Sequence, residues 1–182
     1  MLTRFTEVFG EVDVLLVNGD HVGHGIAPHH DVATKADWPV VRDNLQASAK
    51  LIEKHFPNTL VLTNIGNNDG YHSQAPDEDQ KSAFYGFLYD IWFKDYPGNA
   101  SITKSVKETL MYAGYYRVDV SDTVSVLSMN NEYMDIDNDS SFQGSEASVQ
   151  LDWLEAQLST AGSSGRKFII SGHTYAGTRY KA

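Results

Sequence analysis

The sequence of 182 residues contains no cysteine, which excludes disulfide bonds and thiolate metal sites. Any bound metal must therefore have oxygen and nitrogen ligands. Basic residues are also few, since 14 Lys and Arg stand against 24 Asp and Glu and give a formal net charge of −10. Nucleic acids and anionic membranes attract clustered positive charge, so neither is an expected partner of this chain.

Long hydrophobic runs are missing as well. No segment approaches the roughly 18 consecutive apolar residues of a membrane span, and the first residues lack the apolar stretch of a signal peptide. We therefore expect no transmembrane segment, and the cellular location stays unknown. A chain of this length predicts a single domain over residues 1–182.

Three short apolar runs end in the same kind of turn. The runs "VDVLLV", "NTLVLTN" and "KFIIS" are followed by "NGD", "IGNND" and "GH". A short apolar run bounded by turn residues predicts a strand buried on both faces. Because loops at the carboxyl ends of strands commonly carry binding sites in α/β folds, we expect Asp20, Asn67 and His173 to meet at one sheet edge.

The remaining pattern predicts helices and one hairpin. Apolar residues at helical spacing predict helices over 38–56, 78–95, 101–112 and 146–161, and two apolar segments, 115–120 and 124–129, predict a β-hairpin. In the last helix the residues expected to share the core face are Ala147, Leu151, Leu154 and Leu158. This order of elements favours an α/β sandwich with a mixed sheet.

A carboxylate, an amide and an imidazole suit zinc, manganese or iron, whose ligand preferences overlap. The motifs "NGDHVGH", "GNND" and "SGH" resemble those of the calcineurin-like metallophosphoesterases, specifically the acid sphingomyelinase-like phosphodiesterase and endopolyphosphatase branch. The segments "LYDIWFKDYPG", "AGYYRVDV", "LSMNNEYM" and "QLDWLEAQL" are similar in order and spacing. The resemblance implies the metallophosphoesterase sandwich, phosphoric diester hydrolysis, and a secreted, lysosomal or vacuolar location.

The resemblance also implies a role for each site residue. It implies two divalent ions, zinc first with manganese or iron as alternatives, with Asp20 bridging both ions and Asn67 and His173 binding the second. His24 would stabilise the transition state or protonate the leaving oxygen. Asn68 stands where many relatives carry a catalytic histidine and can donate a hydrogen bond. The implied substrates are small phosphoesters of sphingomyelin, nucleotide or polyphosphate type, and the lack of a basic stripe favours a diester over polyphosphate.

Two elements of the family pattern are missing from this chain: an Asp-x-His before residue 12 and a Gly-His-x-His after residue 173. We therefore expect a domain that is incomplete at both ends and that binds metal weakly by itself. An exposed sheet edge would then favour a homodimer. A truncated, catalytically silent relative is the alternative to an active enzyme.

The other histidines have weaker interpretations. His21 has no role by resemblance and is interpreted as a solvated residue or as a support for the ligands. His29, His30 and His72 would matter only if they replaced the missing ligands.

A calcium-binding module is the alternative from another functional class. Residues 135–146, "DIDNDSSFQGSE", carry acidic residues at loop positions 1, 3 and 5 and Glu146 at position 12, as calcium loops do. Ser140 occupies the position where such a loop needs glycine, and the preceding segment predicts a strand instead of a helix. An acidic surface loop is therefore the favoured interpretation.

Overall fold

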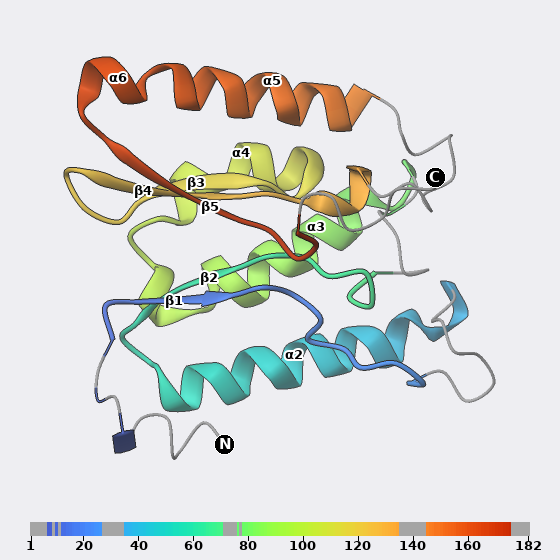
Figure 1. Ribbon diagram of the computed structural model, residues 1–182. Helices are drawn as coiled ribbons and strands as arrows, with labels where there is room; N and C mark the ends of the chain where they lie inside the picture. Colours follow the sequence, from blue (N-terminus) through green and yellow to red (C-terminus); the bar gives the residue numbers. More distant parts are fainter. Residues whose placement is uncertain are drawn as a thin grey trace.

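Helices and strands alternate along most of the chain (Figure 1). The computed structural model describes residues 7–8, 10, 12–26, 35–70, 76, 78–134 and 145–175. The strands are β1 (Val14–Val17), β2 (Leu60–Thr63), β3 (Tyr116–Asp119), β4 (Val124–Ser128) and β5 (Lys167–Ser171). The helices are α2 (Trp38–His55), α3 (Lys81–Tyr89), α4 (Thr103–Ala113), α5 (Ser145–Ser159) and α6 (Ala161–Ser164), with short helical turns η1 (Lys35–Asp37), η2 (Asp90–Lys94), η3 (Pro97–Asn99) and η4 (Asn131–Met134).

The described strands form two sheets. In the first, β1 and β2 pair in parallel with Leu16 opposite Leu62. In the second, β4 pairs antiparallel with β3 and parallel with β5. Figure 1 shows α2 along the outer side of the first sheet and α5 with α6 along the outer side of the second. The predicted α/β sandwich with a mixed sheet is therefore confirmed.

A hydrogen-bonded amide joins the two sheets. Nδ2 of Asn64, directly after β2, donates to Oγ of Ser128 at 2.8 Å and to the carbonyl oxygens of Met129 and Ser171, both at 3.1 Å. The hydroxyl of Tyr116 donates to the carbonyl of Thr63 at 2.7 Å. Because these groups are buried, the bonds are made away from water, where leaving them unmade would be costly. The carboxyl ends of β2 and β5 are therefore held side by side.

The largest side chains of the core are aromatic. The fully buried aromatic residues are Trp92, Tyr85, Tyr96, Tyr116, Tyr133, Phe84 and Phe93. Helix α2 buries Val41, Leu45, Ala49 and Ile52, as its apolar spacing predicts. Among the described helices, none has both the length and the apolarity needed to cross a membrane.

Two predictions about burial are wrong. In β1 Leu16 is 37% exposed, and in β5 Ile169 and Ile170 are 45% and 53% exposed, so neither strand is buried on both faces. The reason is position, because β1 pairs only with β2 and β5 only with β4 in the described part of the chain. An apolar run shows that a strand can be buried, but the number of neighbours decides whether it is.

The predicted core face of α5 is also wrong in part. Leu151 and Leu158 are exposed, and the buried residue of this helix is Gln150. The Gln150 side-chain amide donates to the carbonyl of Asn130 at 3.0 Å and accepts from its N–H at 2.8 Å. Because these two bonds satisfy both backbone groups of Asn130, the helix turns a polar side chain inward.

The calcium-loop hypothesis concerns a segment that lies mostly outside the described residues. Of residues 135–146, the structure describes Ser145 and Glu146 only. Glu146 lies in the first turn of α5 and accepts a hydrogen bond from the Lys81 ammonium group of α3. Both side chains are 13% exposed, so this ion pair occupies the carboxylate that would have been the last calcium ligand.

We expect Glu146→Gln to lower the free energy of unfolding by about 1–2 kcal/mol at pH 7, because Lys81 loses the largely enclosed one of its two carboxylate partners and keeps only the exposed Glu78. Burial raises the pKa of Glu146, but the Lys81 hydrogen bond, a backbone N–H and the Lys81 charge together outweigh it and hold this pKa below its usual value of 4.5. The lowered pKa means that the stabilisation is present above that pH and is lost as the pH falls. Urea unfolding at pH 7 and at decreasing pH checks this. Glu155→Gln, on an exposed position of the same helix, is the control.

Candidate metal centre and active site

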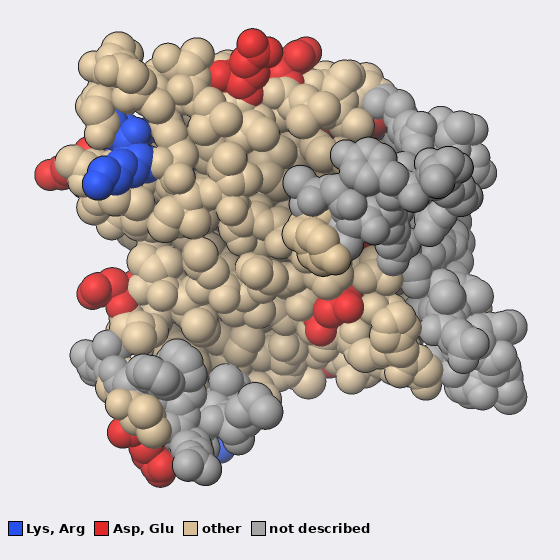
Figure 2. Space-filling model, in the orientation of Figure 1, with Lys and Arg blue, Asp and Glu red and all other residues tan. Residues whose placement is uncertain are grey.

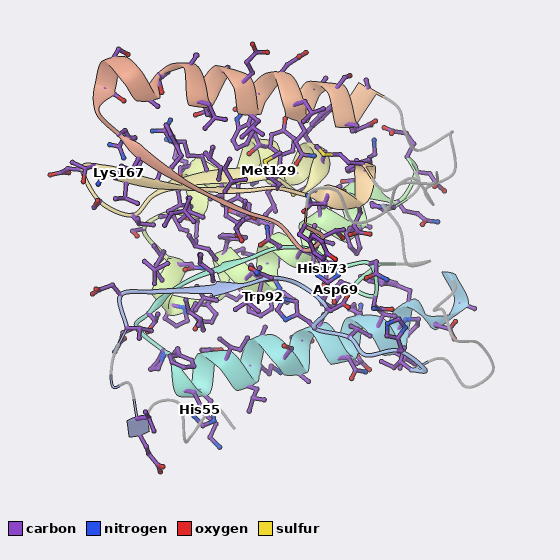
Figure 3. The ribbon with its side chains drawn as sticks, in the orientation of Figure 1. His55, Asp69, Trp92, Met129, Lys167 and His173 are labelled. Atoms are coloured by element: carbon purple, nitrogen blue, oxygen red, sulfur yellow. The ribbon has the colours of Figure 1, made fainter. Side chains whose placement is uncertain are left out.

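Residues that follow three different strands meet at one end of the sheets, where Figure 3 shows His173 close to Asp69. The Nε2 atom of His173 lies 3.1 Å from Oδ1 of Asn67 and 3.5 Å from Oδ1 of Asp20. The structure thus brings together the three residues that the sequence predicts as ligands. We call Asp20, Asn67 and His173 the strand-end cluster.

The hydrogen bond on the far side of the His173 ring sets its tautomer. Nδ1 lies 2.6 Å from the carbonyl oxygen of Asn18, which can only accept, so Nδ1 carries the proton. In the neutral ring Nε2 then presents a lone pair towards the oxygens of Asn67 and Asp20. In that state the three acceptor atoms repel each other unless a cation, or a proton on Nε2, lies among them.

Asn68 connects the Asp20 carboxylate to His24. Its backbone N–H donates to Oδ1 of Asp20 at 3.1 Å, and its side-chain Nδ2 donates to Oδ2 at 3.0 Å. The same Nδ2 lies 3.4 Å from Nε2 of His24, an exposed residue. The two residues predicted to act in catalysis therefore lie beside the strand-end cluster, and Asn68 contacts both the carboxylate and the imidazole.

His21 points away from this cluster. Its Nε2 lies 2.7 Å from Oγ1 of Thr63, its Nδ1 lies 3.1 Å from Oγ of Ser48, and its ring packs at 4.7 Å from that of Trp92. Burial lowers the pKa of His21 to about 4, although the nearby Asp20 charge opposes the shift. His21 is therefore a neutral anchor between β2 and α2, and its interpretation as a solvated residue is wrong.

Asp69 is a site residue that the sequence reasoning missed. It is buried at 1% exposure, and its carboxylate accepts backbone N–H bonds from Asp20 at 2.9 Å, Val22 at 3.1 Å and Gly66 at 2.8 Å. Burial raises the pKa of Asp69 to about 6, and the three N–H donors oppose this shift. The signal for it was present, since it is the acidic residue of "GNND", two positions after the predicted ligand.

Asn18 and Ser171 were also missed. The Ser171 hydroxyl lies 2.6 Å from Oδ1 of Asn64 and 3.1 Å from Oδ1 of Asn18, so it links the ends of β1, β2 and β5. Neither residue has chemistry that marks it in the sequence, because its importance comes from the assembled sheets.

The cluster has few charged ligands. Within the described ranges, no three His, Cys, Asp or Glu side chains are grouped closely enough to hold a metal ion, and the third donor here is the amide of Asn67. The other histidines proposed as replacement ligands, His29, His30 and His72, lie outside the described residues. The residues in place thus offer one carboxylate, one amide oxygen and one imidazole nitrogen.

Comparison with known proteins identifies the family of this chain. The family model described as "Calcineurin-like phosphoesterase" matches residues 2–181. The chain is 26% identical over 181 residues to "Sphingomyelinase phosphodiesterase D" of Dictyostelium discoideum, covering 97% of this chain and 36% of that protein. It is 29% identical over 166 residues to "Sphingomyelin phosphodiesterase A" of the same organism, covering 90% of this chain and 26% of that protein. The chain thus spans about a third or less of the length of these relatives.

The loops after β1 and β2 pass so close to each other that adding one methyl group at Gly66 should destabilise the protein. A Cβ on Gly66 would overlap the backbone nitrogen and the carboxylate of Asp20. We expect Gly66→Ala to lower the free energy of unfolding by about 1–3 kcal/mol, because the loops must separate. Gly162→Ala is the matched control, since a Cβ there meets no atom within 4 Å. Urea unfolding of both variants measures the difference, and equal stability of the two would contradict the close approach.

Proposed function

Because this chain belongs to the calcineurin-like phosphoesterase family, we propose that its strand-end cluster binds a divalent metal ion and that the protein hydrolyses a phosphoric diester. The observation that carries this proposal is the His173 ring. Its proton is fixed on Nδ1 by the Asn18 carbonyl, and its Nε2 faces two oxygen atoms. An imidazole oriented in this way by a backbone carbonyl is the usual arrangement of a metal-binding histidine.

The donor set fits one ion. Asp20, Asn67 and His173 would supply an anionic oxygen, a neutral oxygen and a nitrogen, which suits zinc, manganese or iron. Asp20 is also the residue that would bridge to a second ion. A second ion would need more carboxylate or imidazole ligands, and within the described ranges no three such side chains are grouped together. We therefore propose weak binding and about one ion per chain. We also propose that residues 1–182 form one domain of this family that lacks two of its metal motifs.

A divalent ion at this site would polarise the phosphoryl group and lower the pKa of a bound water. The chain's own residues would orient that chemistry. Asp20 is held in place by both nitrogens of Asn68, so its carboxylate is fixed before substrate binds. His24 is exposed next to it and would donate a proton to the leaving oxygen, work that an imidazole can perform near neutral pH.

For the substrate we propose a diester of the sphingomyelin type, because the matched relatives are named for that activity. Nucleotides and polyphosphate are the alternative substrates. Charge argues against the polymer, since on the face in Figure 2 Lys and Arg gather near the Lys167 end of β5 and His173 follows the opposite end. A long polyanion needs a continuous basic track, which this face does not show.

Substitutions of the cluster residues distinguish an active metal site from a catalytically silent one. We expect Asp20→Asn and His173→Gln each to lower zinc or manganese affinity at least about tenfold and to lower hydrolysis of bis-p-nitrophenyl phosphate about 100-fold or more. His55→Gln, at the end of α2 and away from the site in Figure 3, should change neither. Metal is measured by elemental analysis, and hydrolysis is also measured with sphingomyelin, nucleotides and polyphosphate.

Each outcome of that experiment has a distinct meaning. Metal binding without hydrolysis would favour the catalytically silent relative. Strong turnover of polyphosphate alone would overturn the diester proposal. Equal metal binding by wild type and His173→Gln would show that the strand-end cluster is not the site.

We also propose that a second copy of the chain covers the edge of β5 that pairs with no strand in the described part of the chain. Ile169 and Ile170 are exposed there, and the face in Figure 2 that includes β1 and β5 is largely uncharged. Two chains of net charge −10 can approach each other only through such a face. An edge strand with unpaired backbone groups and apolar side chains is a template for pairing with another strand.

Sedimentation of the wild type should therefore show a concentration-dependent dimer, and Ile170→Lys should shift it towards monomer at least about tenfold in dissociation constant. Leu151→Lys, an equally apolar exposed residue on α5, is the control and should leave the association unchanged. A monomeric wild type at all concentrations would refute the dimer.

A further inference from the structure

One buried carboxylate holds the two loops that carry Asp20 and Asn67 of the strand-end cluster. Oδ2 of Asp69 accepts the N–H groups of Asp20 and Gly66, and Oδ1 accepts the N–H of Val22. Asp20 and Val22 belong to the loop after β1, and Gly66 belongs to the loop after β2. The carboxylate of Asp69 is therefore the shared acceptor of both loops, and it is shielded from water.

The backbone of Asp20 explains why such an acceptor is needed. Asp20 has a φ of 53°, and it is the one non-glycine residue with positive φ among those described. For an L-residue this conformation is strained by about 1–3 kcal/mol and persists only where its surroundings fix it. The Asp69 bond to the Asp20 N–H and the Asn68 bond to the Asp20 side chain provide this constraint from the same loop.

We propose that Asp69 is a positioning residue, which keeps Asp20 in this strained backbone conformation and so aims its carboxylate at His173. This inference rests on the proposed metal site. Asp69 itself does not face the cluster, because both of its oxygens are directed at backbone amides. Its effect on metal binding must therefore pass through Asp20.

A carboxylate is the group that this role requires. Its two oxygens accept at several lone pairs, and here all three donors are backbone N–H groups. An asparagine of the same shape keeps only one oxygen, so its NH₂ group would face at least one N–H. That donor would then be buried without a partner, which is the more damaging way to lose a hydrogen bond.

A second buried side chain provides a matched control. Asn99 is fully buried, its Oδ1 accepts from the N–H of Val61 at 2.9 Å, and its Nδ2 donates to the carbonyls of Val61 and Trp92 at 2.6 and 2.8 Å. Like Asp69, it joins separate segments through three hydrogen bonds to backbone. It does so within β2 instead of at its carboxyl end, so Asn99→Asp tests the loss of stability without touching the cluster.

The experiment compares wild type, Asp69→Asn and Asn99→Asp at a temperature where circular dichroism shows all three folded. Amide hydrogen exchange is measured without metal, cobalt(II) affinity by absorbance titration, and kcat and KM with bis-p-nitrophenyl phosphate. For Asp69→Asn we expect exchange to be at least about tenfold faster at Val22, or at Asp20 and Gly66 if the retained oxygen faces Val22, and cobalt to bind about 10–100-fold more weakly. We expect kcat to fall with KM nearly unchanged. Asn99→Asp should keep wild-type exchange at these amides and wild-type cobalt affinity.

The outcomes separate this inference from the proposed function. Unchanged exchange at all three amides, Asp20, Val22 and Gly66, in Asp69→Asn would overturn the inference, with or without metal. Faster exchange with unchanged cobalt affinity and kcat would overturn it too, since the bonds would then serve the loops alone. If wild type neither binds cobalt nor hydrolyses the diester, the proposed function fails, and the exchange comparison alone decides whether Asp69 holds Asp20.

If Asp69→Asn does not fold, Asp69→Glu is tested in its place. This variant keeps the charge but displaces both oxygens by one methylene. Weaker cobalt binding by this variant supports the inference. Wild-type cobalt affinity overturns it.

Discussion

The close approach of two loops at the end of a parallel strand pair is the constraint on which the site depends. Because β1 and β2 run in the same direction, their carboxyl ends meet at the same edge, and the loops that follow must pass each other. Gly19 and Gly66 lie at the point of contact, where a Cβ on Gly19 would come within 2.5 Å of the Gly66 nitrogen. The absence of side chains at these two positions lets the backbone N–H groups of both loops point to one acceptor.

The second sheet completes the site by a different means. No strand pairing connects β5 to β2 in the described part of the chain; polar contacts between buried side chains do. Asn64 binds Ser128 and the Ser171 carbonyl, and the Ser171 hydroxyl returns a bond to Asn64. His173 follows Ser171 by two residues, so the position of its ring relative to Asp20 depends on this polar junction. Such bonds are directional, and they define the distance between the sheets more closely than apolar contact alone would.

The sequence predicts local features of this molecule well and pairing features poorly. Apolar spacing places α2 almost to the residue, and the three glycine-polar turns identify the strand ends that meet, because both signals are local. The exposure of Ile169 and the inward position of Gln150 depend on which elements pack beside them, and a one-dimensional pattern does not contain that information. Asp69 was missed for a related reason. Its place in "GNND" was visible, but its partners are backbone amides, two of them in a loop 47 and 49 residues away and one at Gly66, and a sequence does not show which loops will meet.

Electrostatics gives the site a preferred order of events. The cluster contains the Asp20 carboxylate with Asp69 directly behind it, His21 is held neutral by burial, and the whole chain carries a charge of −10. A phosphodiester is itself an anion, so Asp20 would repel it in the absence of a positive charge. A cation held by the cluster reverses the local sign, after which the same acidic surroundings hold the cation in place. Under the proposed function, metal would therefore bind before substrate, and the strength of metal binding would limit the activity.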